Sequence, residues 1–108
     1  MALFHNITTV LTKNLLTAGD NVNNLKSITI ANVDTSNDAK VDLFLNKGDD
    51  NFYILKKSDL PVGFTLVLGP EDNIKFNNTT NGYSMRIQVD TGDGATAAAV
   101  DVILRRGA

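Results

Sequence analysis

The stretch 58-SDLPVGFTLVLGPEDNIKF-76 holds a five-residue apolar run between two sharp corners of the chain. Pro61 cannot donate a ladder hydrogen bond and fixes its own φ, so a preceding strand has to end before it. Gly63 permits backbone conformations that other residues resist. The run FTLVL at 64–68 reads as a new strand, which Gly69-Pro70 ends. A short strand between two such corners is typical of a chain that crosses from one sheet of a sandwich to the other.

Apolar residues recur at every second position in five further runs, which is the pattern of half-buried β-strands. The runs are 27–33, 40–46, 52–57, 83–89 and 99–106. Turn-forming residues separate the runs, at 34–38, 46–51, 69–73, 77–82 and 90–94. Strands and turns at this short spacing favour a sandwich or a barrel, and no room remains for the helices of a parallel α/β fold. We expect an all-β chain: a single antiparallel β-sandwich of about seven or eight strands, with jelly-roll or immunoglobulin-like topology.

The length of 108 residues suits one domain. We expect the sandwich core in residues 25–108. In residues 1–24 we expect a strand near 5–12 and then an irregular connection. The segment 13–27 is open to three interpretations: a strand, a loop, or a short helix from Lys13 to Ala18 that Gly19 ends.

Composition excludes several classes of function. The net charge of −2 argues against duplex nucleic acid as a partner, because phosphate binding needs a basic surface. No apolar run approaches the ~20 residues of a membrane-spanning helix, and the N-terminus lacks the basic region of a secretory signal. The chain has no cysteine, which excludes disulfides and thiolate zinc sites. A catalytic triad would have to use the single histidine, His5, which we interpret as an ordinary strand or surface residue.

The candidate metal ligands are Asp90 and Asp93 in the glycine-rich segment 90-DTGDGATA-97. Carboxylate oxygens on such a loop are the ligands that Ca²⁺ prefers, but the complete calcium-loop motif is absent. We favour a solvated hairpin between two strands, because Asp and Gly are ordinary turn residues. The pair Asp49-Asp50 has the same interpretation. We expect no catalytic residues, no metal and no cofactor.

Most aromatic residues occupy alternating strand positions, so we expect them in the core. Tyr53 near Lys56 and Lys57 is the one trace of a stacking platform for a sugar or a single strand of nucleic acid. Arg105 and Arg106 could bind a partner's acids, although keeping the terminus soluble and discouraging edge pairing is the favoured role.

The pattern 28-ITIANVDTSNDAKVDLFLNKGDDNFYILKKSDLPVGFTLVL-68 resembles small structural proteins of tailed bacteriophage virions. The shared elements are a strand with Ile30-Ala31-Asn32, the runs 41–45 and 52–55, the corner 60–68 and the last strand 100–104, so the resemblance covers residues 25–104.

The resemblance implies a non-enzymatic virion component, either a capsid decoration protein or a neck or tail protein. Its partners would be the major capsid protein or neck and tail proteins, and further copies of itself. It also implies that the arm 1–24 could reach onto a neighbouring subunit. The alternative function is a β-sandwich module that binds Ca²⁺ through the 90–94 loop, or a carbohydrate.

Overall fold

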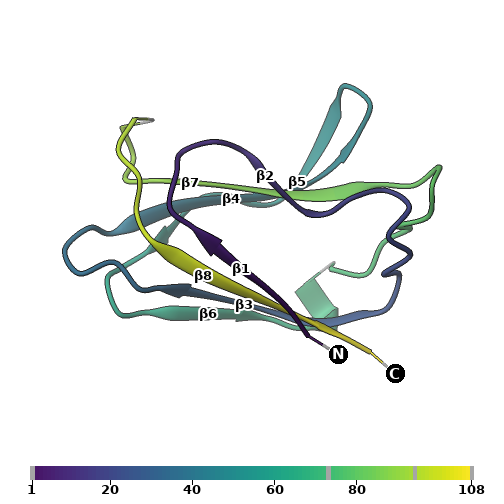
Figure 1. Cartoon of the computed structure of the whole chain (residues 1–108), viewed down its shortest axis with the longest axis horizontal. Helices are drawn as coiled ribbons and strands as arrows, with labels where there is room; N and C mark the ends of the chain where they lie inside the picture. The colour runs from purple at the N-terminus through teal and green to yellow at the C-terminus, as the bar shows by residue number, and fades with distance from the viewer. Residues whose placement is uncertain (1, 73, 94, 108) are drawn as a thin grey trace.

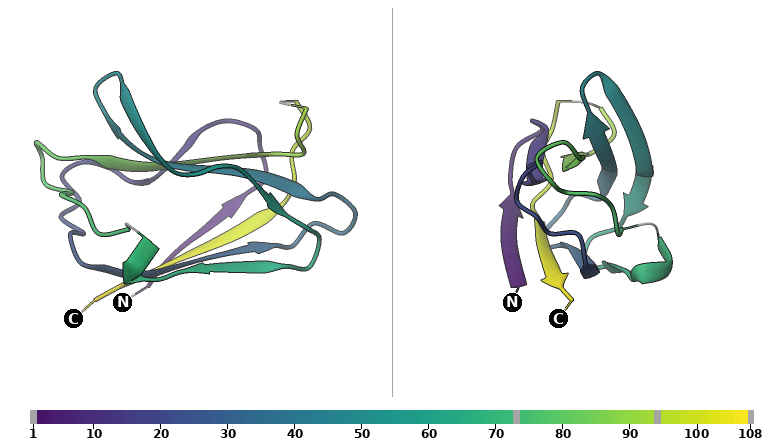
Figure 2. Two further views of the ribbon diagram at one scale, coloured as in Figure 1. Left: turned by 180° about the vertical axis from the view of Figure 1, so that it is seen from behind. Right: turned by 90° about the vertical axis from the view of Figure 1, so that its right-hand side faces the viewer.

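The structure is a computed structural model that describes residues 2–72, 74–93 and 95–107. Met1, Asn73, Gly94 and Ala108 lie outside the described residues, so the predicted turn 69–73 and loop 90–94 are described only in part. Within the described residues, eight strands form two antiparallel sheets of four strands each. The sheets lie face to face as two layers (Figures 1 and 2). The predicted β-sandwich is therefore confirmed.

Sheet A contains, in spatial order, β1 (Ala2–Ile7), β8 (Val100–Arg106), β3 (Leu25–Asn32) and β6 (Thr65–Leu68). Sheet B contains, in spatial order, β2 (Lys13–Leu16), β7 (Ser84–Asp90), β4 (Ala39–Lys47) and β5 (Asp50–Leu60). A 3₁₀ turn, η1 (Pro70–Asp72), follows β6. No helix in the described part of the chain is long and apolar enough to cross a membrane.

The strand orders β1-β8-β3-β6 and β2-β7-β4-β5 define a jelly roll. An immunoglobulin-like sandwich would place its second and fifth strands side by side, whereas here these strands form the two edges of sheet B. Among the described strands, only β4 and β5 follow one another within one sheet, and their hairpin projects beyond the sandwich (Figures 1 and 2). Every other connection crosses between the sheets.

The corner at Pro61 is one of these crossings, as the sequence predicts. β5 ends at Leu60 in sheet B and β6 begins at Thr65 in sheet A. Gly63 adopts a φ of 79°, in the left-handed region, and the Phe64 N–H donates a hydrogen bond to the Pro61 carbonyl at 3.0 Å. The buried Asn32 stabilises this corner, because its Nδ2 donates a hydrogen bond to the Leu60 carbonyl at 2.8 Å.

The core lies between the two sheets. Alternate residues of each strand point inward, and residues of the connections close the ends of the sandwich. Its buried side chains are Ile7, Leu15, Leu16, Val22, Leu25, Ile28, Ile30, Ala39, Val41, Leu43, Leu60, Leu68, Ile74, Met85, Ile87, Val89, Ala98, Val100, Val102 and Leu104. Burial of these aliphatic side chains supplies the main driving force for folding.

The first 24 residues provide one strand to each sheet. The predicted strand near 5–12 overlaps β1 only at residues 5–7. After the buried Ile7 the chain leaves sheet A, crosses to sheet B through exposed residues, and pairs with β7 from Lys13 onward. The irregular connection expected after residue 12 is wrong at its start: of the three interpretations of segment 13–27, Lys13–Leu16 form a strand, β2. The role of this region at a neighbouring subunit stays a prediction.

The prediction of a hairpin at 90–94 is wrong. β7 ends at Asp90 in sheet B, while β8 begins at Val100 in sheet A. The two strands flank the turn in the sequence but belong to different layers, and local turn residues do not distinguish these cases.

Candidate interaction surface

The outer face of sheet A carries a row of four side chains, three of them apolar, across its four strands. Phe4 lies opposite Ile103 in the ladder, Ile103 opposite Thr29, and Thr29 opposite Val67. Because paired residues point to the same face, these four side chains form one row, which we call the apolar band. Phe4 is 72% exposed and Val67 is 61% exposed. Nothing in the described part of the chain covers either side chain.

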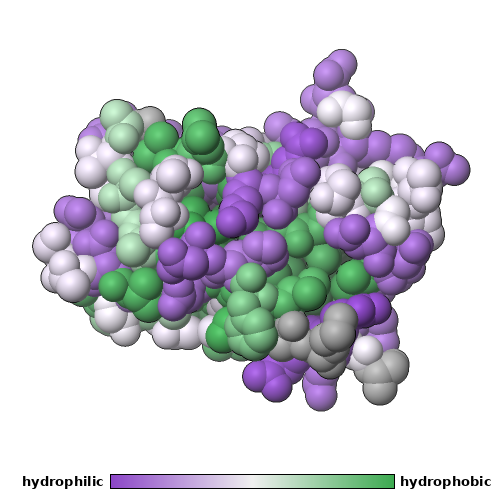
Figure 3. Space-filling view, viewed as in Figure 1, coloured by the Kyte–Doolittle hydropathy of each residue, from purple (hydrophilic) through white to green (hydrophobic). Residues whose placement is uncertain are grey.

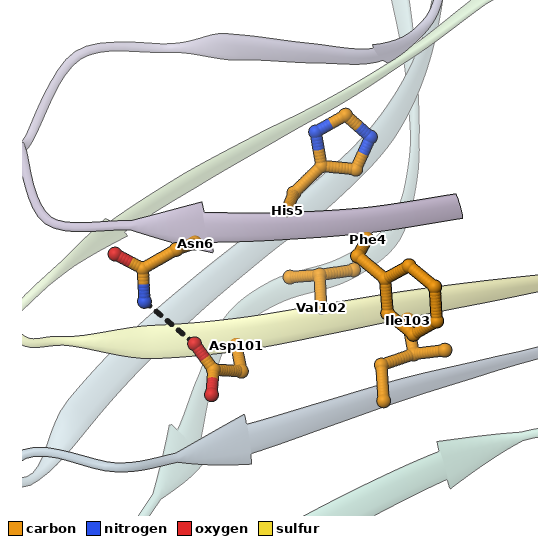
Figure 4. Close-up of a pocket in the computed structure, with 6 residues that line it drawn as sticks. All are labelled: Phe4, His5, Asn6, Asp101, Val102 and Ile103. Atoms are coloured by element: carbon orange, nitrogen blue, oxygen red, sulfur yellow. Dashed lines mark hydrogen bonds between the residues drawn. The ribbon is translucent and has the colours of Figure 1, made fainter. Parts of the chain in front are cut away.

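A groove with a volume of about 340 Å³ lies at the β1–β8 end of the band. Figure 4 shows Phe4 beside Ile103, while His5 points to the opposite side of β1. Asn6 Nδ2 donates a hydrogen bond to Asp101 Oδ1 at 2.6 Å and so holds the carboxylate at the groove. In the space-filling view, apolar surface lies over the lower middle of the molecule, where β1 and β8 run (Figure 3).

Two opposite charges flank the band on β8. Asp101 and Arg105 each lie two residues from Ile103, on opposite sides, so all three side chains share the outer face. Within residues 2–72, 74–93 and 95–107 the one salt bridge joins Lys40 to Asp59. The exposed Arg105 guanidinium therefore has no carboxylate partner in the described part of the chain. Arg106, by contrast, is half-buried.

The expectation that the aromatic residues belong to the core is wrong for most of them. Phe4, Phe64, Phe52 and Tyr53 are exposed, while Phe44 is 6% exposed. In 2-ALFHNI-7 the period-two pattern puts Phe4 on the face opposite Leu3 and Ile7, and Ile7 is the buried one. Alternation separates the two faces of a strand, but it does not say which face is inside. Large exposed apolar side chains that gather on one face are typical of an interaction site.

Two aromatic pairs lie at the base of the β4–β5 hairpin on sheet B. The Phe44 and Tyr53 rings lie 5.0 Å apart between centroids, and Lys56 Nζ lies 4.3 Å from the centroid of the Tyr53 ring. Phe52 meets Tyr83 edge-on at 5.9 Å between centroids. Phe52 and Tyr53 are consecutive residues of the ladder, so the two pairs lie on opposite faces of the hairpin. We call Phe44, Phe52, Tyr53 and Tyr83 the hairpin aromatics.

The predicted stacking platform is thus partly assembled. Tyr53 and Lys56 come together. Lys57 adopts a φ of 47°, and its N–H donates a hydrogen bond to Asp42 Oδ1 at 2.6 Å. Phe44, which the sequence did not single out, lies across the 46–51 turn from Tyr53, and the ladder pairs the two. Tyr83 precedes β7, and only the pairing of β7 with β4 brings it to the hairpin.

The carboxylates of the candidate calcium ligands, Asp90 and Asp93, accept hydrogen bonds from residues of their own loop. Asp93 Oδ1 accepts hydrogen bonds from the N–H groups of Ala95 at 2.8 Å and Thr96 at 2.7 Å, and its Oδ2 accepts one from Thr96 Oγ1 at 2.6 Å. These bonds, with that of the Thr96 hydroxyl the largest, lower the pKa of Asp93 below its usual value of 3.8. Asp90 Oδ1 accepts from the Gly92 N–H at 2.7 Å. In the described part of the chain, no three His, Cys, Asp or Glu side chains are grouped to hold a metal ion.

The remaining predicted positions lie apart from this loop. Asp49 and Asp50 are exposed at the tip of the β4–β5 hairpin. His5 is half-buried on the inner side of β1; burial first, and then the positive charge of Lys13, lower its pKa from 6.5. Its described neighbours are Lys13 and Leu15 of β2 and Val102, which lies opposite it in β8.

Comparison with known protein families finds no match to this chain, and no curated protein has a significantly similar sequence. The fold and the surface chemistry therefore carry the functional argument.

Proposed function

We propose that this chain is a non-enzymatic structural protein of a tailed-phage virion, which binds the capsid shell or the neck and tail through protein–protein contacts. The observation that carries the proposal is that exposed aromatic side chains occur on both sheets: Phe4 on sheet A, and Phe52 and Tyr53 on sheet B. A part that joins its own copies to a shell needs at least two interfaces. The role requires no catalysis, cofactor, nucleic acid or membrane.

The energetics of assembly support this proposal. Exposed aromatic side chains each offer about 150–250 Å² for burial, and such residues dominate the energy of protein interfaces. A symmetric shell presents many identical sites, so individually weak contacts add up. Jelly rolls occur among capsid and lectin domains, although a fold alone does not establish a function. The sequence resemblance over residues 25–104 points to the virion rather than to a lectin.

Mass spectrometry of gradient-purified particles, from the phage whose genome encodes the chain, tests the proposal. We expect the protein in a fixed ratio to the major capsid protein, and immunogold electron microscopy should place it on the capsid or at the neck and tail. Its presence in infected cells but absence from purified particles would contradict the proposal.

A surface variant identifies the contact with the shell. The hairpin aromatics Phe52 and Tyr53 are both exposed, so the double substitution Phe52→Ser and Tyr53→Ser removes apolar contact area and leaves the core intact. We expect the variant to fold but to enter particles poorly. Leu11→Ser, which removes an exposed apolar side chain outside both surfaces, is the matched control and should enter particles normally.

A carbohydrate-binding module is the second candidate, because the exposed Tyr53 beside Phe44 could stack on a sugar ring. Calorimetric titration with bacterial surface polysaccharides tests it. Heat that Tyr53→Ala abolishes, together with absence from particles, would favour this candidate over the virion role.

A further inference from the structure

We propose that two copies of this chain stack the outer faces of sheet A on one another, about a twofold axis that runs along the apolar band. The inference rests on the proposed structural function and identifies one of its partners as a second copy. It assigns the apolar band to self-association and leaves the hairpin aromatics of sheet B for the shell.

The outward residues of β8 carry the argument. Along this strand the outer face reads Asp101, Ile103, Arg105, so an acid and a base lie on opposite sides of an apolar centre. At about 3.3 Å per residue the charged positions are about 13 Å apart, with Ile103 midway between them. β3 and β6 present the neutral residues Thr29, Ala31, Thr65 and Val67 on this face. On β8 the charge pattern is therefore antisymmetric about the band, and the exposed Lys26, at the β3 bulge, adds a second base at the Arg105 end.

This pattern is complementary to itself under one particular twofold axis. An axis along the band, across the strands, reverses the direction of every strand of the second copy. Asp101 of each copy then faces Arg105 of the other, which makes two identical ion pairs in an isologous interface. An axis along the strands would instead bring Asp101 over the neutral side of the sheet, near Ala31, and would pair no charges. The charges thus select the first axis.

The shape of the face fits the same arrangement. Stacked sheets lie about 10 Å apart, so outward side chains of both copies have to interdigitate. Each copy offers Phe4 as a projecting side chain and, next to it, the groove between Phe4, Asn6, Asp101 and Ile103. With the axis along the band, each band residue lies opposite its own copy, so the two Phe4 rings lie against one another beside the groove. The Asn6 hydrogen bond already orients the Asp101 carboxylate at the groove wall.

Charge reversal tests the axis. Asp101→Arg places a base opposite Arg105 of the other copy, and Arg105→Asp places an acid opposite Asp101. Both single variants should dimerise at least ~10-fold more weakly than the wild type in sedimentation equilibrium, because each interface then holds two like-charge contacts. An equimolar mixture of the two variants should recover the dimer as a heterodimer, since both contacts are again of opposite charge. The double variant Asp101→Arg, Arg105→Asp should recover it as well.

Controls separate these effects from misfolding. Circular dichroism should give the same β spectrum for all variants, and recovery in the mixture cannot come from a chain that fails to fold. Phe4→Ser should abolish the dimer, whereas the control Leu11→Ser should leave it unchanged. Raised salt should weaken the wild-type dimer and strengthen the self-association of each single variant. A monomeric wild type, or a mixture that recovers nothing, would overturn the proposal.

Cysteine cross-linking locates the axis independently, because the chain has no cysteine of its own. Thr29→Cys lies in the band and should form a symmetric disulfide-linked dimer under mild oxidation. Thr65 lies on β6, next to β3, and is two residues along the strand from the band residue Val67. Thr65→Cys should therefore cross-link poorly. The reverse result would contradict an axis along the band. Solution dimerisation and incorporation into particles are separate measurements, so this inference can fail while the virion role stands, and the reverse.

Discussion

Asn78 and Val22 are joined by a buried hydrogen bond between two loops that lie far apart in the sequence. Asn78 Oδ1 accepts a hydrogen bond from the Val22 N–H at 3.0 Å, and Asn78 Nδ2 donates to the carbonyls of Thr17 at 3.1 Å and Tyr83 at 2.9 Å. The Asn78 side chain is completely buried. One amide thus satisfies three backbone groups at the end of the sandwich where β2 leads into β3.

Asn78→Ala should destabilise the fold by about 1–3 kcal/mol, because it leaves buried backbone groups without partners. Urea unfolding followed by circular dichroism measures the change. Asn81→Ala, an exposed asparagine of the same segment, is the matched control and should change stability by less than about 0.5 kcal/mol. Equal stability of the two variants would show that the Asn78 bonds contribute nothing net.

Gly63→Ala should also destabilise the fold, for a different reason. Gly63 has a φ of 79°, and no atom lies within 4 Å of an added Cβ, so the whole cost is backbone strain of about 1–3 kcal/mol. Gly69→Ala, at the other corner of the same strand, is the control: its φ lies outside the left-handed region, and an added Cβ would make an ordinary contact with Asp72 Oδ2 at 4.0 Å. Thermal melts of both variants test the difference. A Gly69→Ala variant less stable than Gly63→Ala would contradict the assignment of strain to Gly63.

Asp93 should stay ionised at a pH where ordinary aspartates are protonated. Hydrogen bonds from Thr96 and Ala95 favour the carboxylate in the folded state and lower its pKa below 3.8. The stabilisation is therefore present above pH 3.8 and is lost as the pH falls through the lower folded pKa. The ¹³C shift of the Asp93 carboxyl reports the titration. Thr96→Val removes the hydroxyl, which is the largest cause, and should raise the pKa.

The same loop distinguishes structure from metal binding. If Asp90 and Asp93 only shape the loop, the melting temperature of the wild type should be the same in calcium and in chelator. A higher melting temperature in calcium, which Asp93→Ala abolishes, would make the loop a site and contradict the structural role.

His5 should titrate below its usual pKa of 6.5, because burial and the positive charge of Lys13 both disfavour the imidazolium. The neutral form is favoured in the folded state, so its contribution to stability is complete above pH 6.5 and is lost as the pH falls from 6.5 through the folded pKa. Proton NMR gives the midpoint directly, since the chain has one histidine. Lys13→Met should raise the midpoint. A wild-type midpoint above 6.5 would contradict the buried position of His5.

Local signals in the sequence were sufficient for β3 to β8 and for the 61–63 corner, but not for the bounds of β1 or for β2. The alternation in 83–89 predicts β7, and the 61–63 corner predicts a crossing between sheets with a special backbone at Gly63. Both signals act within a few residues, because side-chain alternation and backbone sterics are properties of the local chain. The same locality explains the error at 90–94, where the turn residues are equally suited to a hairpin and to a crossing.

The sequence by itself determined that this chain is all-β, since alternation and turn spacing favour a sandwich or a barrel and leave no room for helices. Only the tertiary structure decided that the topology is a jelly roll, that Phe4 faces outward, and that Phe4, Ile103, Thr29 and Val67 form one row. These residues come from four strands that are distant in the sequence, and their alignment depends on strand order and register. Register is set by the burial of the opposite face against the other sheet, which is a property of the whole fold and of no single segment.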